Sequence, residues 1–225
     1  KLLLADSHLD IAIIEPSDKH YYQPAWTLVG GGVYNIQDTV RPEADYIPKG
    51  AKWIRDAVTA FQPEQNSVTT RNGLNISYDY LVVCPGIQIN WAQVEGLPET
   101  LGKNNVCSNY SFDTAPYTFE SIKNVQKGRS LFTSAAGAIK CGGAPQKIMY
   151  LAGNYYKRHR NPGDVKIEFY SAGSVIFGIE KYAKTLRKVV ERYDIGTHFK
   201  HELIKVDGPR KIAVFKVTDA EGNVT

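Results

Sequence analysis

The stretch that decides the fold is "SLFTSAAGAIKCGGAPQKIMYLAGNYYKRH", residues 130–159. Its first six residues predict a strand. The sixteen residues from Ala144 predict a helix, because Pro145 suits the first helical turn and the basic residues 157–160 complement the dipole at the last turn. A turn of small residues joins the two elements. This strand–turn–helix unit predicts an α/β domain.

The same alternation continues toward the carboxyl end. "VKIEFYSAGSVIFG" (165–178) predicts a strand with a Gly-rich exit, and "IEKYAKTLRKVVERYD" (179–194) predicts a helix. Six apolar positions of that helix are spaced for one buried face: Ile179, Tyr182, Ala183, Leu186, Val189 and Val190. Residues 197–208 and 211–225 predict further strands. Alternating strands and helices favour a parallel, doubly wound sheet.

The amino-terminal part predicts a second sheet. "LDIAIIEP" (9–16) is typical of a buried parallel strand ending in an acid, and "KLLLADSH" (1–8) of the end of a helix. Residues 51–61 and 66–86 predict strands, with a hairpin turn at Asn72-Gly73 and a buried strand at "YLVVCPG" (80–86). A loop at 91–105 predicts a boundary. We therefore expect two Rossmann-like, three-layer domains of the dinucleotide-binding type, at 1–105 and 106–225, the first of them incomplete.

Composition excludes several classes of function. The 225 residues carry a net charge of +4 with scattered Lys and Arg, and there is no concentrated basic face for nucleic acid. No apolar run approaches the roughly 20 residues of a membrane span. Three widely spaced cysteines suit a reducing compartment.

Two features suggest a nucleotide ligand. An acid such as Glu15, at the end of a strand in a nucleotide-binding fold, accepts hydrogen bonds from ribose hydroxyls, although a solvated strand end has the same pattern. "HYYQPAW" (20–26) follows that strand, and loops at the carboxyl ends of parallel strands bind ligands. An aromatic loop that covers the core would have the same sequence pattern.

The cysteines divide by context. Cys84 lies inside an apolar run and is predicted to be a small core residue, and Cys107 has no reactive neighbourhood. Cys141 lies on the loop entering a helix, where Lys140 and backbone N–H groups favour a thiolate. The alternative is a small residue filling a tight turn. We expect no metal site, because the spacing of His198 and His201 puts them on opposite faces of one strand.

Four stretches carry a resemblance to a known family: "HYYQPAWTLVGGG" (20–32), "YDYLVVCPGIQ" (78–88), "VCSNYS" (106–111) and "IKCGGAPQKIMYLA" (139–152). They resemble the sulfide:quinone oxidoreductases of the branch shared by bacteria and mitochondria, in the family's order, across almost the whole chain. The resemblance implies FAD as cofactor and sulfide and quinone as partners.

The resemblance also implies residue roles. Glu15 corresponds to the ribose-binding acid, Gln23 to the loop near the flavin, Val58 to the strand that meets the adenine, and Gly86 to the turn that closes on the cofactor. Cys141 corresponds to one of two redox cysteines. Hydrosulfide would attack the bridge between them and leave a persulfide, and two electrons would pass through FAD to quinone.

Several parts of the family pattern are expected outside these residues: the phosphate-binding Gly-rich turn, the second redox cysteine beyond Thr225, and the end that binds the membrane surface. The 225 residues alone are expected to bind FAD weakly and to lack turnover. We expect a peripheral membrane enzyme, of a bacterial inner membrane in preference to a mitochondrial one.

Two other functions share this fold. A type II NADH:quinone oxidoreductase would need a Gly-rich fingerprint near 134–143 or 172–178 and would not need Cys141. A flavin-free sensor of sulfide or persulfide is the non-enzyme alternative. Neither explains the sequence around Cys141 as well as the sulfide:quinone oxidoreductases do.

Overall fold

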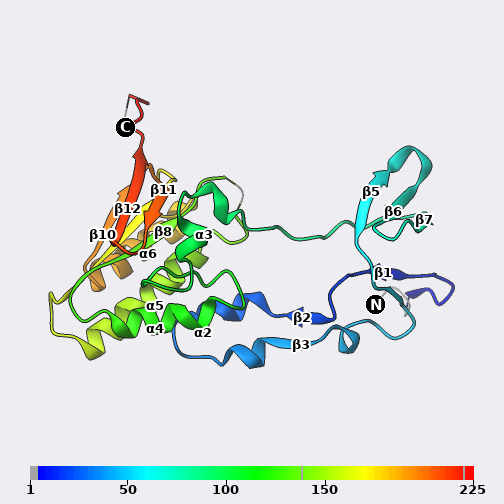
Figure 1. Cartoon of the computed structure of the whole chain (residues 1–225), viewed down its shortest axis with the longest axis horizontal. Helices are drawn as coiled ribbons and strands as arrows, with labels where there is room; N and C mark the ends of the chain where they lie inside the picture. The colour runs from blue at the N-terminus through cyan, green and yellow to red at the C-terminus, as the bar shows by residue number, and fades with distance from the viewer. Residues whose placement is uncertain (1–4, 138, 220) are drawn as a thin grey trace. The chain divides into compact units, whose positions relative to one another are not determined.

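The computed structural model describes residues 5–137, 139–219 and 221–225. Their contacts divide the chain into two compact units (Figure 1). The first unit comprises the chain up to residue 22 together with 37–86, and the second comprises 23–36 and 87–225. Both units combine parallel or antiparallel strands with helical segments, which confirms the predicted α/β class. The predicted boundary near residue 105 stays a prediction.

The second unit is built on a parallel sheet of three strands. β8 (Gly128–Ser134), β9 (Val165–Ser171) and β10 (Ile195–Phe199) lie in that order. α5 (Ala144–His159) connects β8 to β9, and α6 (Glu180–Arg192) connects β9 to β10. The predicted alternation and the bounds of the first helix are therefore confirmed.

The core of the second unit lies between α5 and this sheet. Its buried members come from one face of α5, from the middle of β9, and from α4 (Ala115–Asn124) and β10: Ile148, Met149, Ala152, Tyr156, Ile167, Phe169, Ile122 and Ile195. Met149 is fully buried. A change from a buried Met to Ala costs about 2–5 kcal/mol, so this helix face fixes the position of α5 on the sheet.

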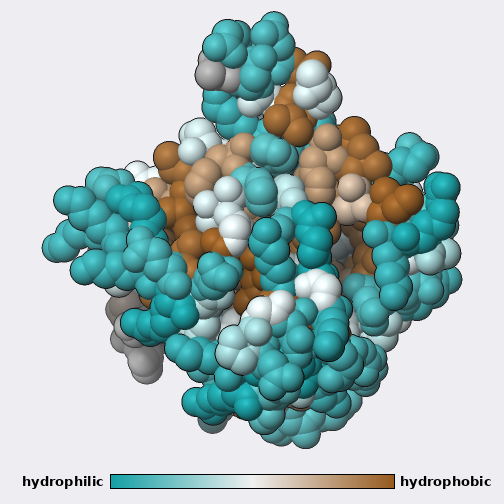
Figure 2. All heavy atoms as spheres, turned by 90° about the vertical axis from the view of Figure 1, so that its left-hand side faces the viewer, coloured by the Kyte–Doolittle hydropathy of each residue, from teal (hydrophilic) through white to brown (hydrophobic). Residues whose placement is uncertain are grey.

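α6 buries less than its sequence predicts. Ala183 is its one buried side chain, whereas Tyr182 on the helix and Ile179 just before it are more than half exposed. Figure 2 shows apolar surface in separate patches between polar ones on one side of the molecule. Among the described residues no helix is both long enough and apolar enough to cross a membrane.

A hairpin and short helices complete the second unit. β11 (His201–Asp207) pairs antiparallel with β12 (Ile212–Val217), which confirms a strand within 211–225, whereas the single strand predicted over 197–208 is divided between β10 and β11. α2 (Trp26–Gly30) packs against α4 and α5. The short helices of the unit are η1 (Gln23–Ala25), η5 (Trp91–Gln93) and α3 (Leu97–Thr100).

Three small sheets form the first unit. β1 (Ala12–Ile14) runs parallel to β4 (Lys52–Ile54), and β2 (Lys19–Tyr21) pairs antiparallel with β3 (Val40–Pro42). β5 (Val58–Gln62), β6 (Ser67–Thr70) and β7 (Asn75–Ser77) form an antiparallel sheet. Two 3₁₀ helices lie in connections between strands of this unit: η3 (Glu43–Asp45) between β3 and β4, and η4 (Pro63–Gln65) between β5 and β6. A third, η2 (Ile36–Thr39), precedes β3, and its first residue belongs to the second unit.

The predicted hairpin turn is confirmed. Gly73 has a φ of +82° and donates its N–H to the Thr70 carbonyl over 3.0 Å. The strand predicted over 51–61 is divided into β4 and β5. Buried Asp56 lies in the break, and its carboxylate accepts hydrogen bonds from the N–H groups of Ala57 and Asn72 at 2.8 and 3.2 Å. Those bonds hold a bend in place of a continuous strand.

The prediction of a buried strand over 80–86 is wrong for this chain. Residues 81–90 form no regular element, and Tyr80 and Val82 are 92% and 83% exposed. A strand needs neighbours to pair its backbone groups, and no described strand lies alongside. Cys84 is therefore exposed and not a core residue. The predicted helix end over 1–8 falls partly on residues 1–4, which lie outside the described residues.

Candidate active site

Cys141 lies on the loop that connects β8 to α5, and it is exposed. Its carbonyl accepts the N–H of Ala144 at 3.1 Å, and the Gly143 carbonyl accepts the N–H of Lys147 at 3.0 Å. Gly143 is the N-cap residue, with no side-chain cap, and Pro145 lies in the first turn. The thiol thus lies two residues before the N-cap of a sixteen-residue helix, near its positive end.

Lys140 is fixed by a residue from a distant part of the sequence. Its Nζ donates to Oε1 of Gln23 over 2.6 Å. Gln23 opens η1, which leads directly into the buried residues Ala25 and Trp26. The loop before Cys141 therefore contacts Gln23, and both lie in the second unit, which begins at Gln23 within "HYYQPAW".

A third segment reaches the same place. Tyr110, in "VCSNYS", has a raised pKa, first because of burial and second because of the nearby Cys141 sulfur. Its neighbour Asn109 is buried and donates from Nδ2 to Thr27 Oγ1 over 3.0 Å, which ties this loop to α2. The phenol of Tyr110 stays protonated at neutral pH and can act as a donor. The sequence did not predict Tyr110 as a site residue, although "VCSNYS" (106–111), which contains it, is one of the four stretches that resemble the family.

Three consecutive glycines let α2 approach its neighbours. A Cβ on Gly30 would lie 3.2 Å from atoms of Asn109, Thr118 and Ile148, and one on Gly32 would lie 2.3 Å from the Phe119 ring. Gly32 also has a φ of +75°. The "GGG" of this segment is therefore required by close packing, which brings Gln23 and Asn109 to the site.

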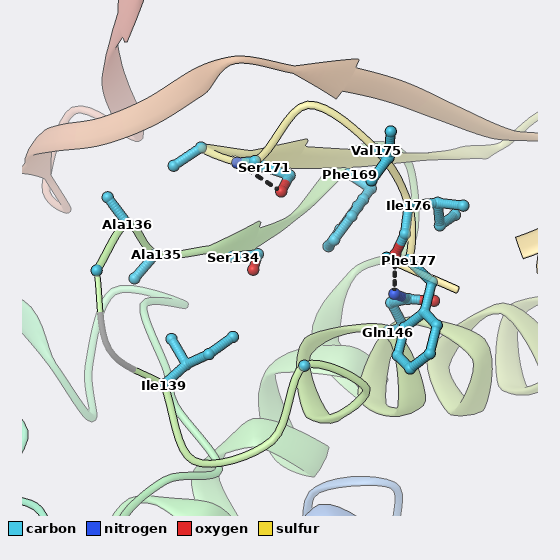
Figure 3. Close-up of a pocket in the computed structure, with 15 residues that line it drawn as sticks. Ser134, Ala135, Ala136, Ile139, Gln146, Phe169, Ser171, Val175, Ile176 and Phe177 are labelled. Carbon is cyan, nitrogen blue, oxygen red and sulfur yellow. Dashed lines mark hydrogen bonds between the residues drawn. The ribbon is translucent and has the colours of Figure 1, made fainter. Parts of the chain in front are cut away.

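A pocket of about 410 Å³ opens beside this loop at the carboxyl ends of β8 and β9 (Figure 3). Ser134 and Ser171, the last residues of the two strands, line it together with Phe169 and the two exit loops. Figure 3 shows Gln146 reaching from α5 to the Ile176 carbonyl, to which its Nε2 donates. No described lining residue is charged. Ala138 in this loop lies outside the described residues.

The other predicted cofactor residues lie in the first unit. Glu15 follows β1, at the carboxyl end of a parallel strand, and its N–H donates to the Ile54 carbonyl over 3.1 Å. Val58 begins β5, and Gly86 has a φ of +74°. A carboxylate at such a strand end and a backbone open to close approach fit the ribose and the closing turn of FAD. Gln23 and Cys141 lie in the second unit.

The remaining cysteines differ from Cys141. Burial raises the pKa of the Cys107 thiol, and the hydroxyls of Thr118 and Ser121 oppose that shift only in part. A buried neutral thiol is a poor nucleophile. Cys84 is exposed but belongs to the first unit.

His198 and His201 do not lie on opposite faces of one strand, so that prediction is wrong. They lie on β10 and β11, because Lys200 between them has a φ of +58° and turns the chain. Their ring centroids are 5.7 Å apart, and both rings contact Tyr170. Among the described residues no group of three or more His, Cys, Asp or Glu could hold a metal ion.

Solved structures show which known fold the chain shares. The sulfide:quinone oxidoreductase of Aquifex aeolicus matches this chain with a TM-score of 0.79 at 20% sequence identity. The match covers all of this chain and 52% of the Aquifex chain. A ferredoxin reductase of Rhodopseudomonas palustris matches 99% of this chain and 52% of its own with a TM-score of 0.63 at 15% identity. NDH2 of Plasmodium falciparum, solved in complex with NADH, has a TM-score of 0.60 at 12% sequence identity. That match covers 90% of this chain and 45% of the NDH2 chain. The chain has the α/β fold of these oxidoreductases.

Sequence narrows the class. The mitochondrial sulfide:quinone oxidoreductase of Dictyostelium discoideum is 47% identical over 96% of this chain, and that of Mus musculus is 39% identical over 95%. The chain is a relative of the sulfide:quinone oxidoreductases, and the resemblance predicted from the motifs is confirmed. It spans about half the length of these relatives, 48% and 47%. No protein-family model matches the chain.

The expectation of a bacterial over a mitochondrial membrane is wrong. The relatives named mitochondrial match 92–96% of the chain at 34–47% identity. The sulfide-quinone reductase of Aquifex aeolicus matches 52% of it at 30%.

Proposed function

We propose that the protein oxidises sulfide and passes the electrons to a quinone, with FAD as its resident cofactor and Cys141 as a redox cysteine. The observation that carries the proposal is the exposed thiol of Cys141 at the entry to α5, beside the Lys140–Gln23 hydrogen bond of 2.6 Å. The relationship to sulfide:quinone oxidoreductases over 96% of the chain supports it.

Cys141 forms a disulfide with a second cysteine in the oxidised enzyme. Cys107, whose pKa is raised by burial, does not suit this partner role, and the resemblance to the family favours a partner outside the 225 residues. Hydrosulfide attacks the bridge: its sulfur bonds to one cysteine sulfur, the S–S bond breaks, and the other cysteine leaves as a thiolate. The positive end of α5 stabilises that thiolate if it is Cys141. The persulfide sulfur then leaves on an acceptor such as a second sulfide.

Three residues of the first unit would hold the cofactor. The Glu15 carboxylate would accept hydrogen bonds from the ribose, the backbone at Val58 would meet the adenine, and Gly86 would let the chain close on the ring system. Gln23 would approach from the loop that contains it. When bound, FAD supplies the two-electron chemistry that connects re-formation of the disulfide to quinone reduction.

We propose that the enzyme works at the surface of a mitochondrial membrane. The quinone is a membrane molecule, so the enzyme must meet it at the bilayer without having to cross it. The names of the relatives supply the compartment.

Steady-state reduction of a soluble quinone analogue by the full-length protein tests the proposal. We expect turnover with sulfide and none with NADH, and loss of turnover on Cys141→Ser. Turnover with NADH that survives Cys141→Ser would instead establish the type II NADH:quinone oxidoreductase, whose fold this chain shares with a TM-score of 0.60. A protein purified without flavin and without turnover would support the sensor.

A further inference from the structure

We propose that Lys140, held in place by Gln23, makes the Cys141 site selective for anionic sulfur nucleophiles, hydrosulfide over neutral hydrogen sulfide. Gln23 is then a positioning residue that acts through Lys140. This inference rests on the proposed function, because it takes Cys141 as the reacting group. It adds the residue that recognises the hydrosulfide anion and the residue that holds it in position.

The geometry of the pair keeps its positive charge. Lys140 Nζ donates to the neutral amide oxygen Gln23 Oε1 over 2.6 Å, and no described ion pair includes Lys140. A carboxylate partner would cancel the charge, whereas an amide only orients it. An ammonium group has three N–H donors, so two remain for an anion.

The position of the pair is fixed by the fold. Gln23 stands directly before a segment whose Ala25 and Trp26 are 3% and 8% exposed, so its backbone has a fixed place. Tyr110 has a pKa that is raised by burial and then by the nearby Cys141 sulfur, so it stays neutral. The positive charge of Lys140 is therefore not opposed from that side, and the end of α5 adds to it.

Two alkylating reagents of similar size separate charge from reactivity. Iodoacetate is an anion and iodoacetamide is neutral, and both form a C–S bond with the same thiolate and release iodide. The ratio of their rates at Cys141 cancels the fraction of thiolate and reports the local field. The rates are measured on the reduced full-length protein by mass spectrometry of the peptide that contains Cys141, with flavin content as the check on folding.

We expect Lys140→Met to lower the iodoacetate-to-iodoacetamide ratio about fivefold, the factor that one charge near contact distance gives in water. Lys140→Arg should keep the ratio. Gln23→Glu should lower it while leaving the lysine in place, because the new carboxylate neutralises the ammonium. Lys157→Met, which removes an exposed lysine in the last turn of the same helix, is the matched control and should leave it unchanged.

An unchanged ratio in Lys140→Met and Gln23→Glu would overturn the inference, since the lysine would then exert no field at Cys141. An equal fall in Lys157→Met would overturn it too, because the effect would be one of net charge. The proposed function fails separately, if sulfide leaves the flavin of the wild-type protein oxidised while the alkylation ratio still depends on Lys140. In steady-state turnover, Lys140→Met should raise the KM for sulfide more than it lowers kcat. Lys140→Arg should keep the KM close to that of the wild-type protein.

Discussion

Asn109 donates from its side-chain amide to Thr27 Oγ1 over 3.0 Å, and both residues are buried. This bond joins the loop that carries Tyr110 to α2, 82 residues earlier in the chain. Because α2 directly follows η1, which begins at Gln23, the bond also ties together two of the three segments around Cys141.

Asn109→Ala should lower the free energy of unfolding by about 1–3 kcal/mol, the cost of leaving a buried hydroxyl without its partner. Thr27→Val also leaves the Asn109 amide without its acceptor, but it should cost less, because the valine fills the same volume and leaves no cavity. Chemical denaturation of the two single variants and the double variant measures the coupling. A coupling energy near zero would contradict a direct bond between these side chains.

Gly32→Ala should destabilise the protein more than Gly73→Ala does. Both glycines have positive φ, +75° and +82°, so both substitutions pay for backbone strain. Only at Gly32 would the new Cβ clash, 2.3 Å from the Phe119 ring, whereas nothing lies within 4 Å at Gly73. We expect a difference of about 1–3 kcal/mol in unfolding free energy. Equal losses would show that the ring moves aside at no cost.

Glu168 should make stability depend on pH in the acid range. Hydrogen bonds from the Arg129 guanidinium, and after it from Tyr170, lower the pKa of this buried carboxyl from 4.5 to about 2. Since the folded pKa lies below the unfolded one, the stabilisation is complete above about pH 4.5 and is lost as the pH falls toward 2.

Removing the guanidinium tests this linkage. Arg129 is 59% exposed, so solvent screening reduces the effect, and we expect Arg129→Met to cost about 1–2 kcal/mol at pH 7. The cost should shrink at pH 3, which urea denaturation at the two pH values measures. Lys205→Met removes a partner of the exposed Glu95 and should cost less at both. A cost of Arg129→Met that is the same at both pH values would exclude the linkage.

Cys107 should react with iodoacetamide about tenfold more slowly than Cys141 at pH 8, because burial raises the pKa of its thiol while Cys141 is exposed. Mass spectrometry of the separate peptides measures both rates in one sample. In 6 M guanidinium the two rates should converge. Equal rates in the folded protein would mean that Cys107 is accessible and would reopen it as the disulfide partner.

Local signals predicted the elements whose interactions are local. α5 has the predicted bounds, because Pro145 and the small residues before it define its start. The Asn72-Gly73 turn needs only its own four residues. The segment over 80–86 failed for the opposite reason: an apolar run becomes a strand only beside another strand, and none of the described strands pairs with it.

The candidate site shows the same division. Cys141 was recognisable, because its loop position follows from the strand and helix on either side. Its neighbours Gln23 and Tyr110 come from segments far away in the sequence, and only the packing of α2 against α4 and α5 brings them there. The turn at Lys200 could not be predicted either, because no sequence pattern marks a lysine whose backbone adopts the left-handed conformation.

The central claim is that Cys141 is the group through which sulfide reaches the flavin. Anaerobic titration of the full-length protein with sulfide, followed by flavin absorbance, tests it most directly when Cys141→Ser is run alongside. We predict that sulfide bleaches the wild-type flavin and leaves that of Cys141→Ser oxidised. Bleaching of both proteins at the same sulfide concentration and rate would show that Cys141 only fills a turn, and would contradict the account.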